Sequence, residues 1–163
     1  MKSILYFGLT SVLHMGLLGQ SQATVTDGVK TPEILEAYHS IQTALAKDDF
    51  ATARNEAIQL TSKLDKWKEK GVDASAVKQI RMGAQAIADE ANKDKIRRQF
   101  GVLSEGTVKL LQKSENWRNN WKLYHCPMAK GYKKWVQPTN EDKMMNPYMG
   151  ASMQQCGSSK PWG

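Results

Sequence analysis

Sulfur-containing side chains gather in the last third of this 163-residue chain. From residue 116 onward the sequence holds both cysteines, Cys126 and Cys156, together with five methionines: Met128, Met144, Met145, Met149 and Met153. Thiolate and thioether sulfur are polarisable ligands that suit Cu(I), whereas the oxygen ligands that Ca²⁺ and Mg²⁺ require are scarce in this segment. The residue types therefore predict a site for a soft metal ion.

Two short stretches carry the candidate ligands. Tyr124-His125-Cys126-Pro127-Met128 offers three potential ligands within four residues, on a stretch that proline makes rigid and extended. Further on, Met149 and Met153 share one helical face, and Cys156 follows three residues later. The predicted metal ligands are His125, Cys126, Met128, Met149, Met153 and Cys156. Met144 and Met145 fit packing better, because adjacent residues seldom point at one ion.

The first 23 residues have the pattern of a secretory signal peptide. Met1-Lys2 gives a short positive start, an apolar stretch follows, and Ser21-Gln22-Ala23 places small residues before a cleavage point. The apolar stretch of roughly 15 residues is shorter than the ~20 needed to span a bilayer, so no stable membrane anchor is expected. We expect a processed chain of residues 24–163 that is periplasmic or secreted.

Export would place Cys126 and Cys156 in an oxidising compartment, where a pair of cysteines most often forms a disulfide. Closing a loop of this size stabilises a fold by roughly 3 to 4 kcal/mol in the chain-entropy model. Methionine also fills irregular gaps against aromatic side chains without binding metal. A disulfide-stapled module and a metal site therefore both remain open, and reduction of the pair would supply two thiolates for Cu(I).

Amphipathic periodicity predicts the elements that position these residues. Apolar residues recur at three- and four-residue spacing in three stretches. The stretches run from Thr31 to Lys47, from Asp48 or Asp49 to Gly71, and from Asp73 to about Leu110. The third stretch is long enough for one helix or two. Connections are short and no strand-like alternation of any length is evident. This pattern predicts an all-α fold, an up-and-down bundle of about four helices over 31–113. An irregular Cys-, Met- and Trp-rich segment, 116–163, would pack on the bundle.

The charge balance is uneven along the chain. Lysine and arginine number 23 against 16 aspartate and glutamate, a formal net charge of +7, and the excess lies in residues 117–163. Such asymmetry can indicate an acidic partner, an anionic membrane surface or nucleic acid, but an ordinary solvated basic face is the simpler explanation. No nucleic-acid-binding motif accompanies the charge, so we expect no nucleic-acid partner.

Motifs of catalysis are missing from the sequence. His125 is adjacent to Cys126, but a nucleophile and its base normally converge from separate segments and need a third, orienting group. Neither a Gly-rich phosphate loop nor a nucleophile elbow nor a pair of zinc-binding histidines is present. We expect a protein that is not an enzyme.

Short motifs in the last third resemble a known family. The sequence reads Y-H-C-P-M-A from residue 124, then Trp135, then N-P-Y-M-G from residue 146 and M-x-x-C-G from residue 153. In this order the motifs resemble the DUF3347 family of exported bacterial domains. Arg98-Gln99-Phe100 and the helical pattern from about residue 31 fit the family too, so the resemblance covers nearly the whole processed chain.

The resemblance implies a small helical domain that occurs alone or at the end of periplasmic adaptor subunits of copper and silver efflux systems. By position it implies Cys126, Met128, Met153 and Cys156 as metal ligands, with His125 adjacent. Met149 stands where the family more often has an aromatic residue, and the chain lacks the hairpin and barrel regions of an adaptor. The expected partners are therefore a Cu(I) or silver ion and a heavy-metal efflux system or copper chaperone, beside which the protein would act.

Overall fold

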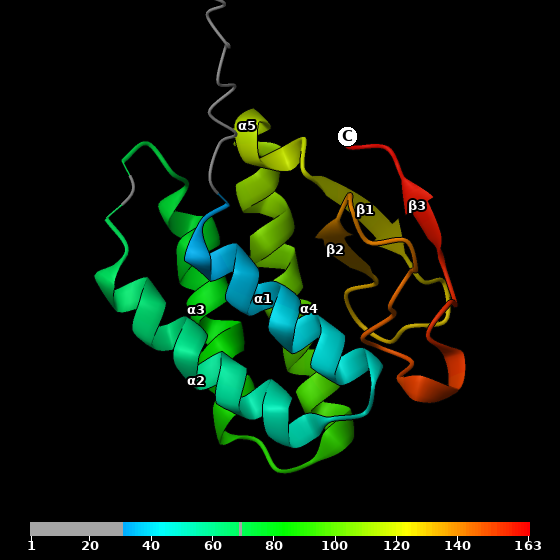
Figure 1. Cartoon of the computed structure of the whole chain (residues 1–163). Helices are drawn as coiled ribbons and strands as arrows, with labels where there is room; N and C mark the ends of the chain where they lie inside the picture. Colours follow the sequence, from blue (N-terminus) through cyan, green and yellow to red (C-terminus); the bar gives the residue numbers. More distant parts are fainter. Residues whose placement is uncertain (1–30, 69) are drawn as a thin grey trace, which may run out of the picture.

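Four consecutive helices make up most of the computed structural model, which describes residues 31–68 and 70–163. The helices are α1 (Glu33–Ala46), α2 (Phe50–Lys66), α3 (Ala74–Asp89) and α4 (Lys93–Gln112). Each packs against the next in the chain, as an up-and-down bundle requires (Figure 1). The predicted signal peptide, residues 1–23, lies outside the described residues.

Side-chain caps explain where three of these helices begin. Asp49 accepts a hydrogen bond from the Thr52 backbone N–H at 3.0 Å at the start of α2, and Asp73 accepts one from Ser75 at 2.9 Å before α3. Asn92 caps α4 in the same way. The cap at Asn92 also separates α3 from α4, so the predicted stretch after Asp73 is two helices.

Glycine allows α3 and α4 to approach closely. A Cβ atom on Gly106 of α4 would lie 2.8 Å from the backbone nitrogen of Ile80 in α3. A Cβ on Gly83 of α3 would lie 2.6 Å from Cα of Leu103 in α4. Both distances are shorter than real contacts of a Cβ atom, so these two positions require glycine for packing.

The segment after α4 contains a sheet, which corrects the all-α prediction. After the short helix α5 (Glu115–Arg118) come three antiparallel strands in the order β2-β1-β3. They are β1 (Trp121–His125), β2 (Lys134–Pro138) and β3 (Ser158–Lys160), and a 3-10 turn, η1 (Ala151–Met153), precedes β3. The fold is therefore a helical domain with a small antiparallel sheet.

The sheet escaped the sequence pattern because its strands do not alternate. Trp135, Val136 and Gln137 of β2 are consecutive and all buried, whereas all three residues of β3 are exposed. A strand that is covered on both faces, or on neither, has no polar–apolar period of two.

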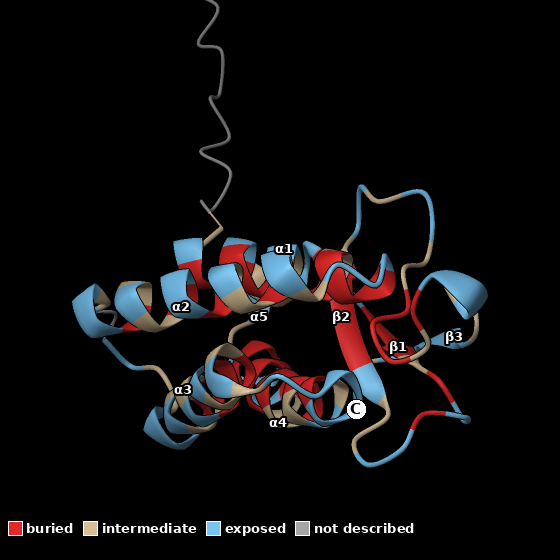
Figure 2. Ribbon diagram, turned by 90° about the horizontal axis from the view of Figure 1, so that it is seen from below, coloured by how far each residue is buried: buried red, intermediate tan, exposed pale blue. Residues whose placement is uncertain are grey.

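Hydrogen bonds fix the sheet to the bundle. The Tyr38 hydroxyl of α1 accepts from the Val136 backbone N–H at 3.2 Å, and the Ser104 hydroxyl of α4 donates to the Lys134 carbonyl at 3.0 Å. Figure 2 shows buried residues where the helices face one another and where β2 lies against them, and exposed residues along the outer side of α2. The core thus continues from the bundle into the sheet.

In residues 31–68 and 70–163, none of the helices combines the length and the apolar content that crossing a membrane requires.

Candidate metal-binding site

Strand pairing brings the two cysteines together. In the antiparallel pair of β1 and β3, His125 is opposite Ser158, so Cys126 directly after β1 lies beside the residues directly before β3. The Sγ atoms of Cys126 and Cys156 are 3.4 Å apart and are not bonded to each other. Gly157 lies between Cys156 and β3 with φ of +140°, where a Cβ would come within 2.8 Å of the His125 carbonyl oxygen.

A third sulfur joins this pair from the turn that follows β1. Sδ of Met128 lies 3.7 Å from Sγ of Cys156. Two sulfurs that bind one ion at about 2.3 Å each lie roughly 4 Å apart, so both distances from the Cys156 sulfur are close to those that a shared ion would need. We call Cys126, Met128 and Cys156 the sulfur cluster.

The sulfur cluster runs from the core to the surface. Cys126 is fully buried, Cys156 is partly buried, and Met128 is 58% exposed. The hydrogen bond with Cys126 and partial burial raise the pKa of the Cys156 thiol. A soft metal ion that binds here must therefore displace a proton from a thiol that holds it firmly.

The other predicted ligands take different positions. Met149 and Met128 both line a cavity of about 240 Å³ beside α4. Met153 lies in η1 and is 39% exposed, and His125 is half-buried at the end of β1. The Cys156 backbone N–H donates to the Met153 carbonyl at 3.0 Å, but among the described residues neither the Met153 side chain nor the His125 ring makes a hydrogen bond to a sulfur atom of the cluster. The structure thus brings together three of the six predicted ligands, and Met149 lines the same cavity as one of them.

Nitrogen and carboxylate ligands do not complete the site. In the described parts of the chain, no three His, Cys, Asp or Glu side chains are grouped so that they could hold a metal ion. The sulfur cluster contains two such residues, and its third member is a thioether.

Asn146 positions the site. In the sequence it is the first residue of the N-P-Y-M-G motif, which by itself predicts no role for its side chain. Its buried side chain donates to the Cys156 carbonyl at 2.5 Å and accepts from the backbone N–H groups of Tyr148 and Met149 at 2.8 and 3.2 Å. The amide therefore ties the chain before β3 to the Met149 turn. A polar residue just before Pro147 is typical of such turns and was the available signal in the sequence.

The turn at Gly150 is attached to the helical bundle through Asp48. The Asp48 carboxylate accepts from the Ala151 backbone N–H at 2.9 Å and pairs with Arg97 of α4. These bonds hold the pKa of Asp48 below its ordinary value, the hydrogen bond from Ala151 first among them. Asp48 itself has a φ of 61°, in the left-handed region that aspartate tolerates better than most residues.

The sequence matches the model of a family described as "Protein of unknown function (DUF3347)" over residues 34–119, which is more than half of the chain. The chain belongs to the DUF3347 family. No curated protein and no solved structure matches it. The DUF3347 match contains the four helices of the bundle and α5.

The family match is narrower than the resemblance drawn from the motifs. It ends before β1, so the C-P-M-A, N-P-Y-M-G and M-x-x-C-G motifs follow the matched residues. Membership of the DUF3347 family therefore rests on the bundle, and the ligands in the sulfur cluster have to be argued from their own geometry.

Proposed function

We propose that this protein binds Cu(I) or Ag(I) through Cys126, Met128 and Cys156 and takes part in copper handling or efflux after export to the periplasm. The observation that carries the proposal is the convergence of three sulfur atoms from two separate segments. A heavy-metal efflux system or a copper chaperone would supply or receive the ion. The role is one of binding and transfer, without catalysis.

The chemistry of the donors supports a soft monovalent ion. Two thiols and a thioether match Cu(I) and Ag(I), which prefer polarisable sulfur, better than they match Mg²⁺ or Ca²⁺, which prefer oxygen. The exposed Met128 gives an arriving ion a first contact, and the buried Cys126 lies behind it. This arrangement from surface to core would let Met128 capture an ion that the cysteines then bind more tightly.

The test is competition for Cu(I) against a chromogenic chelator, with the purified protein in reduced and in oxidised form and with thiols counted in the same samples. We expect the reduced protein to take up one ion per chain and the Met128→Leu variant to bind at least tenfold more weakly, since leucine keeps the volume and removes the sulfur.

Met82→Leu is the matched control, because Met82 is 54% exposed on α3, away from the cluster. This variant should bind as the unchanged protein does, and circular dichroism should show the same helicity for both. Equal affinity of the reduced protein and its Cys156→Ser variant would contradict the proposal.

A second candidate function is a disulfide-stapled module that docks on a protein partner and binds no metal. The 3.4 Å between the two Sγ atoms favours it, because a small movement would bring them to bonding distance. Formation of the bond releases two protons and passes two electrons to a thiol oxidant. Protein that is exported without free thiols, and that binds no Cu(I) after reduction, would favour this module.

A further inference from the structure

A second cleft lies at the opposite end of β1 from the sulfur cluster. It has a volume of about 710 Å³ and lies between the start of α1, the later half of α2 and α5, which leads into β1. The residues that line it come from these three elements, from the chain just before α1 and from the residue directly after α2: Thr31, Pro32, Glu33, Ile34, Gln59, Ser62, Lys63, Lys66, Trp67 and Trp117. Its volume is within the usual range of small-molecule sites.

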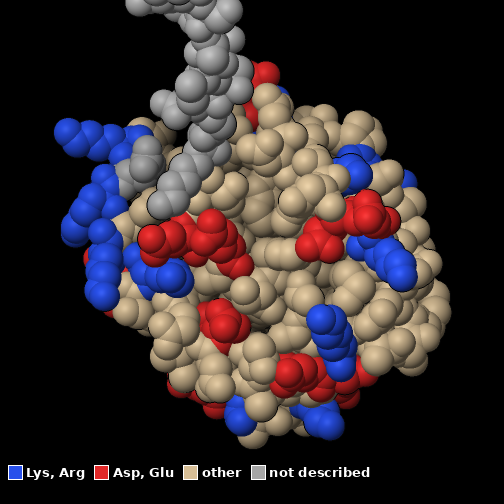
Figure 3. Space-filling view, in the orientation of Figure 1, with Lys and Arg blue, Asp and Glu red and all other residues tan. Residues whose placement is uncertain are grey.

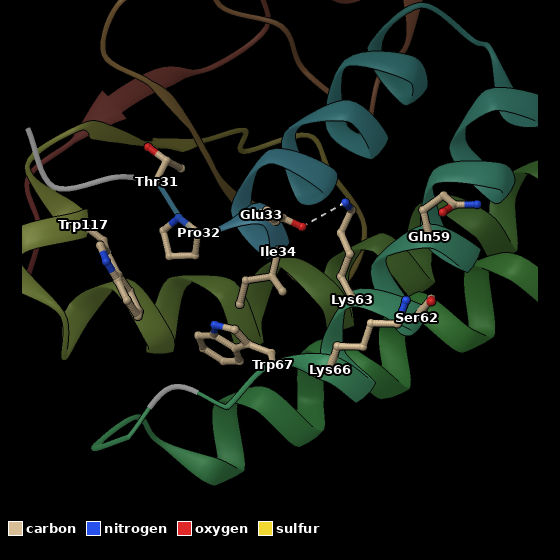
Figure 4. A pocket seen from close by; sticks show the side chains of 10 residues that line it. All are labelled: Thr31, Pro32, Glu33, Ile34, Gln59, Ser62, Lys63, Lys66, Trp67 and Trp117. Atoms are coloured by element: carbon tan, nitrogen blue, oxygen red, sulfur yellow. Dashed lines mark hydrogen bonds and ion pairs between the residues drawn. The ribbon is translucent and has the colours of Figure 1, made fainter.

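One end of this cleft is aromatic. The rings of Trp67 and Trp117 lie with their centroids 6.1 Å apart and their planes at 44°, and both side chains are partly buried. Pro32 and Ile34 lie next to them (Figure 4). Two partly exposed indole rings beside aliphatic groups offer a surface for a flat apolar body.

The other end is polar and basic. Gln59, Ser62 and Lys66 follow one face of α2, and Figure 4 shows them on the far side of Ile34 from Trp117. In the space-filling view, basic side chains gather at the edge of the molecule beside the end of α2 (Figure 3).

Within residues 31–68 and 70–163, one of the two lysines that line the cleft has no ion-pair partner. Lys63 is paired with Glu33 across the cleft at 3.4 Å. Lys66 makes no ion pair with any residue in 31–68 or 70–163. Asp65, its neighbour in sequence, is paired with Arg81 instead. With one carboxylate and two ammonium groups in its lining, the cleft has a net charge of +1.

We propose that this cleft binds a small aromatic carboxylate, with the ring against Trp67 and Trp117 and the carboxylate toward Lys66. From Gln59 to Lys66, α2 rises by about 10 Å, enough for one or two fused rings and an acid group. The two lysines would repel a cationic ligand. A neutral apolar ligand would cover Lys66 without supplying an opposite charge. This site is independent of the sulfur cluster.

The test uses naphthalene-2-carboxylate as the probe and the uncharged naphthalene-2-carboxamide as its match. The purified protein has five tryptophans, whose indole N–H signals can be followed by nitrogen-15 NMR and assigned with single Trp→Phe variants. We expect the carboxylate to shift the signals of Trp67 and Trp117 and to leave that of Trp162, which donates to the Trp121 carbonyl, unchanged. The amide should bind at least fivefold more weakly.

Charge variants separate ligand binding from a structural role. Lys66→Gln should weaken binding of the carboxylate at least fivefold, and Glu33→Gln should tighten it by releasing Lys63. Lys78→Gln, at an exposed position on α3, is the control and should change nothing. Equal binding of carboxylate and amide, or absence of shifts at Trp67 and Trp117 at millimolar probe, would overturn the proposal.

Discussion

Asn146 is a fully buried polar residue whose amide joins Cys156 to Tyr148 and Met149. Its backbone N–H also donates to the Gln154 carbonyl at 2.7 Å. Buried amides of this kind stabilise a fold because the groups they satisfy would otherwise lose water without gaining a partner.

Replacing Asn146 with alanine should therefore leave three backbone groups without their partner. We expect Asn146→Ala to lower the free energy of unfolding by about 3 kcal/mol. Urea denaturation would measure the change, and Asn140→Ala, at an exposed position after β2, should cost almost nothing. Equal stability of the two variants would show that the bonds of Asn146 are replaced by water.

The two exposed methionines of the C-terminal segment should differ in their effect on metal binding. In the described residues the Met153 sulfur makes no hydrogen bond to the sulfur cluster, whereas Sδ of Met128 lies 3.7 Å from Sγ of Cys156. We expect Met153→Leu to leave the Cu(I) affinity of the reduced protein within about twofold of its original value, while Met128→Leu weakens it. A chelator competition that shows equal losses for both variants would place Met153 among the ligands.

At the scale of single residues, the sequence predicted that most of the ligands would be sulfur atoms. It predicted only part of the group of residues that the fold brings together. Cys126 and Met128 are two residues apart, so their proximity follows from the chain itself. Cys156 joins them only through the pairing of β3 with β1, and β3 consists of Ser158, Ser159 and Lys160, which carry no apolar signal. The prediction of His125 and Met153 as ligands rests on short motifs. The motifs carry no information about how the folded chain packs around these two residues.

The pairing of α3 with α4 depends on two glycines that lower the intrinsic helix propensity of both helices. Gly106 lies inside the periodic stretch from Asp73 to about Leu110, which continues on both sides of it. The contact that each glycine permits was not predictable, because it depends on which two helix faces meet.

Alanine at either position should push the helices apart. We expect Gly83→Ala and Gly106→Ala each to lower the free energy of unfolding by about 2 to 3 kcal/mol, because the added Cβ meets backbone atoms of the facing helix. Gly101→Ala is the comparison, since its Cβ would lie 3.3 Å from the side chain of Tyr132, which can adjust. Thermal unfolding that shows Gly106→Ala to be neutral or stabilising would contradict this account.

The helices were predictable because each has one buried face and one exposed face, and because Asp49 and Asp73 provide caps. The sheet was not, because consecutive residues of β2 are buried, so both faces of this strand are covered and its sequence does not alternate. Its burial follows from the tertiary arrangement, which periodicity along the chain does not encode.

His39 connects the helical bundle to the segment after β2. Its ring meets Trp121 edge to face, and its Nε2 lies 3.7 Å from a Glu141 carboxylate oxygen. Burial lowers the pKa of His39 below its ordinary value of 6.5, and the negative charge of Glu141 only partly opposes this.

The stability of the whole molecule should therefore depend on pH through His39. The folded state favours the neutral ring, so its stabilising effect is complete above the pKa of about 6.5 in the unfolded chain and is lost as the pH falls through the lower folded value. We expect the urea midpoint to fall between about pH 7 and pH 5, and the His39→Gln variant to show a shallower fall. The same slope in both proteins would assign the effect to other groups.

The pairing of β3 with β1 also determines when the two cysteine sulfurs can meet during synthesis of the chain. Cys126 leaves the ribosome thirty residues ahead of Cys156, and the two sulfurs meet only after residues 158–160 have followed and paired with β1. An unfolded chain would therefore keep Met128 near Cys126 but would lack the second thiol of the cluster. The complete set of three sulfurs would form only after folding, so under the proposed function metal binding by the full cluster would follow folding.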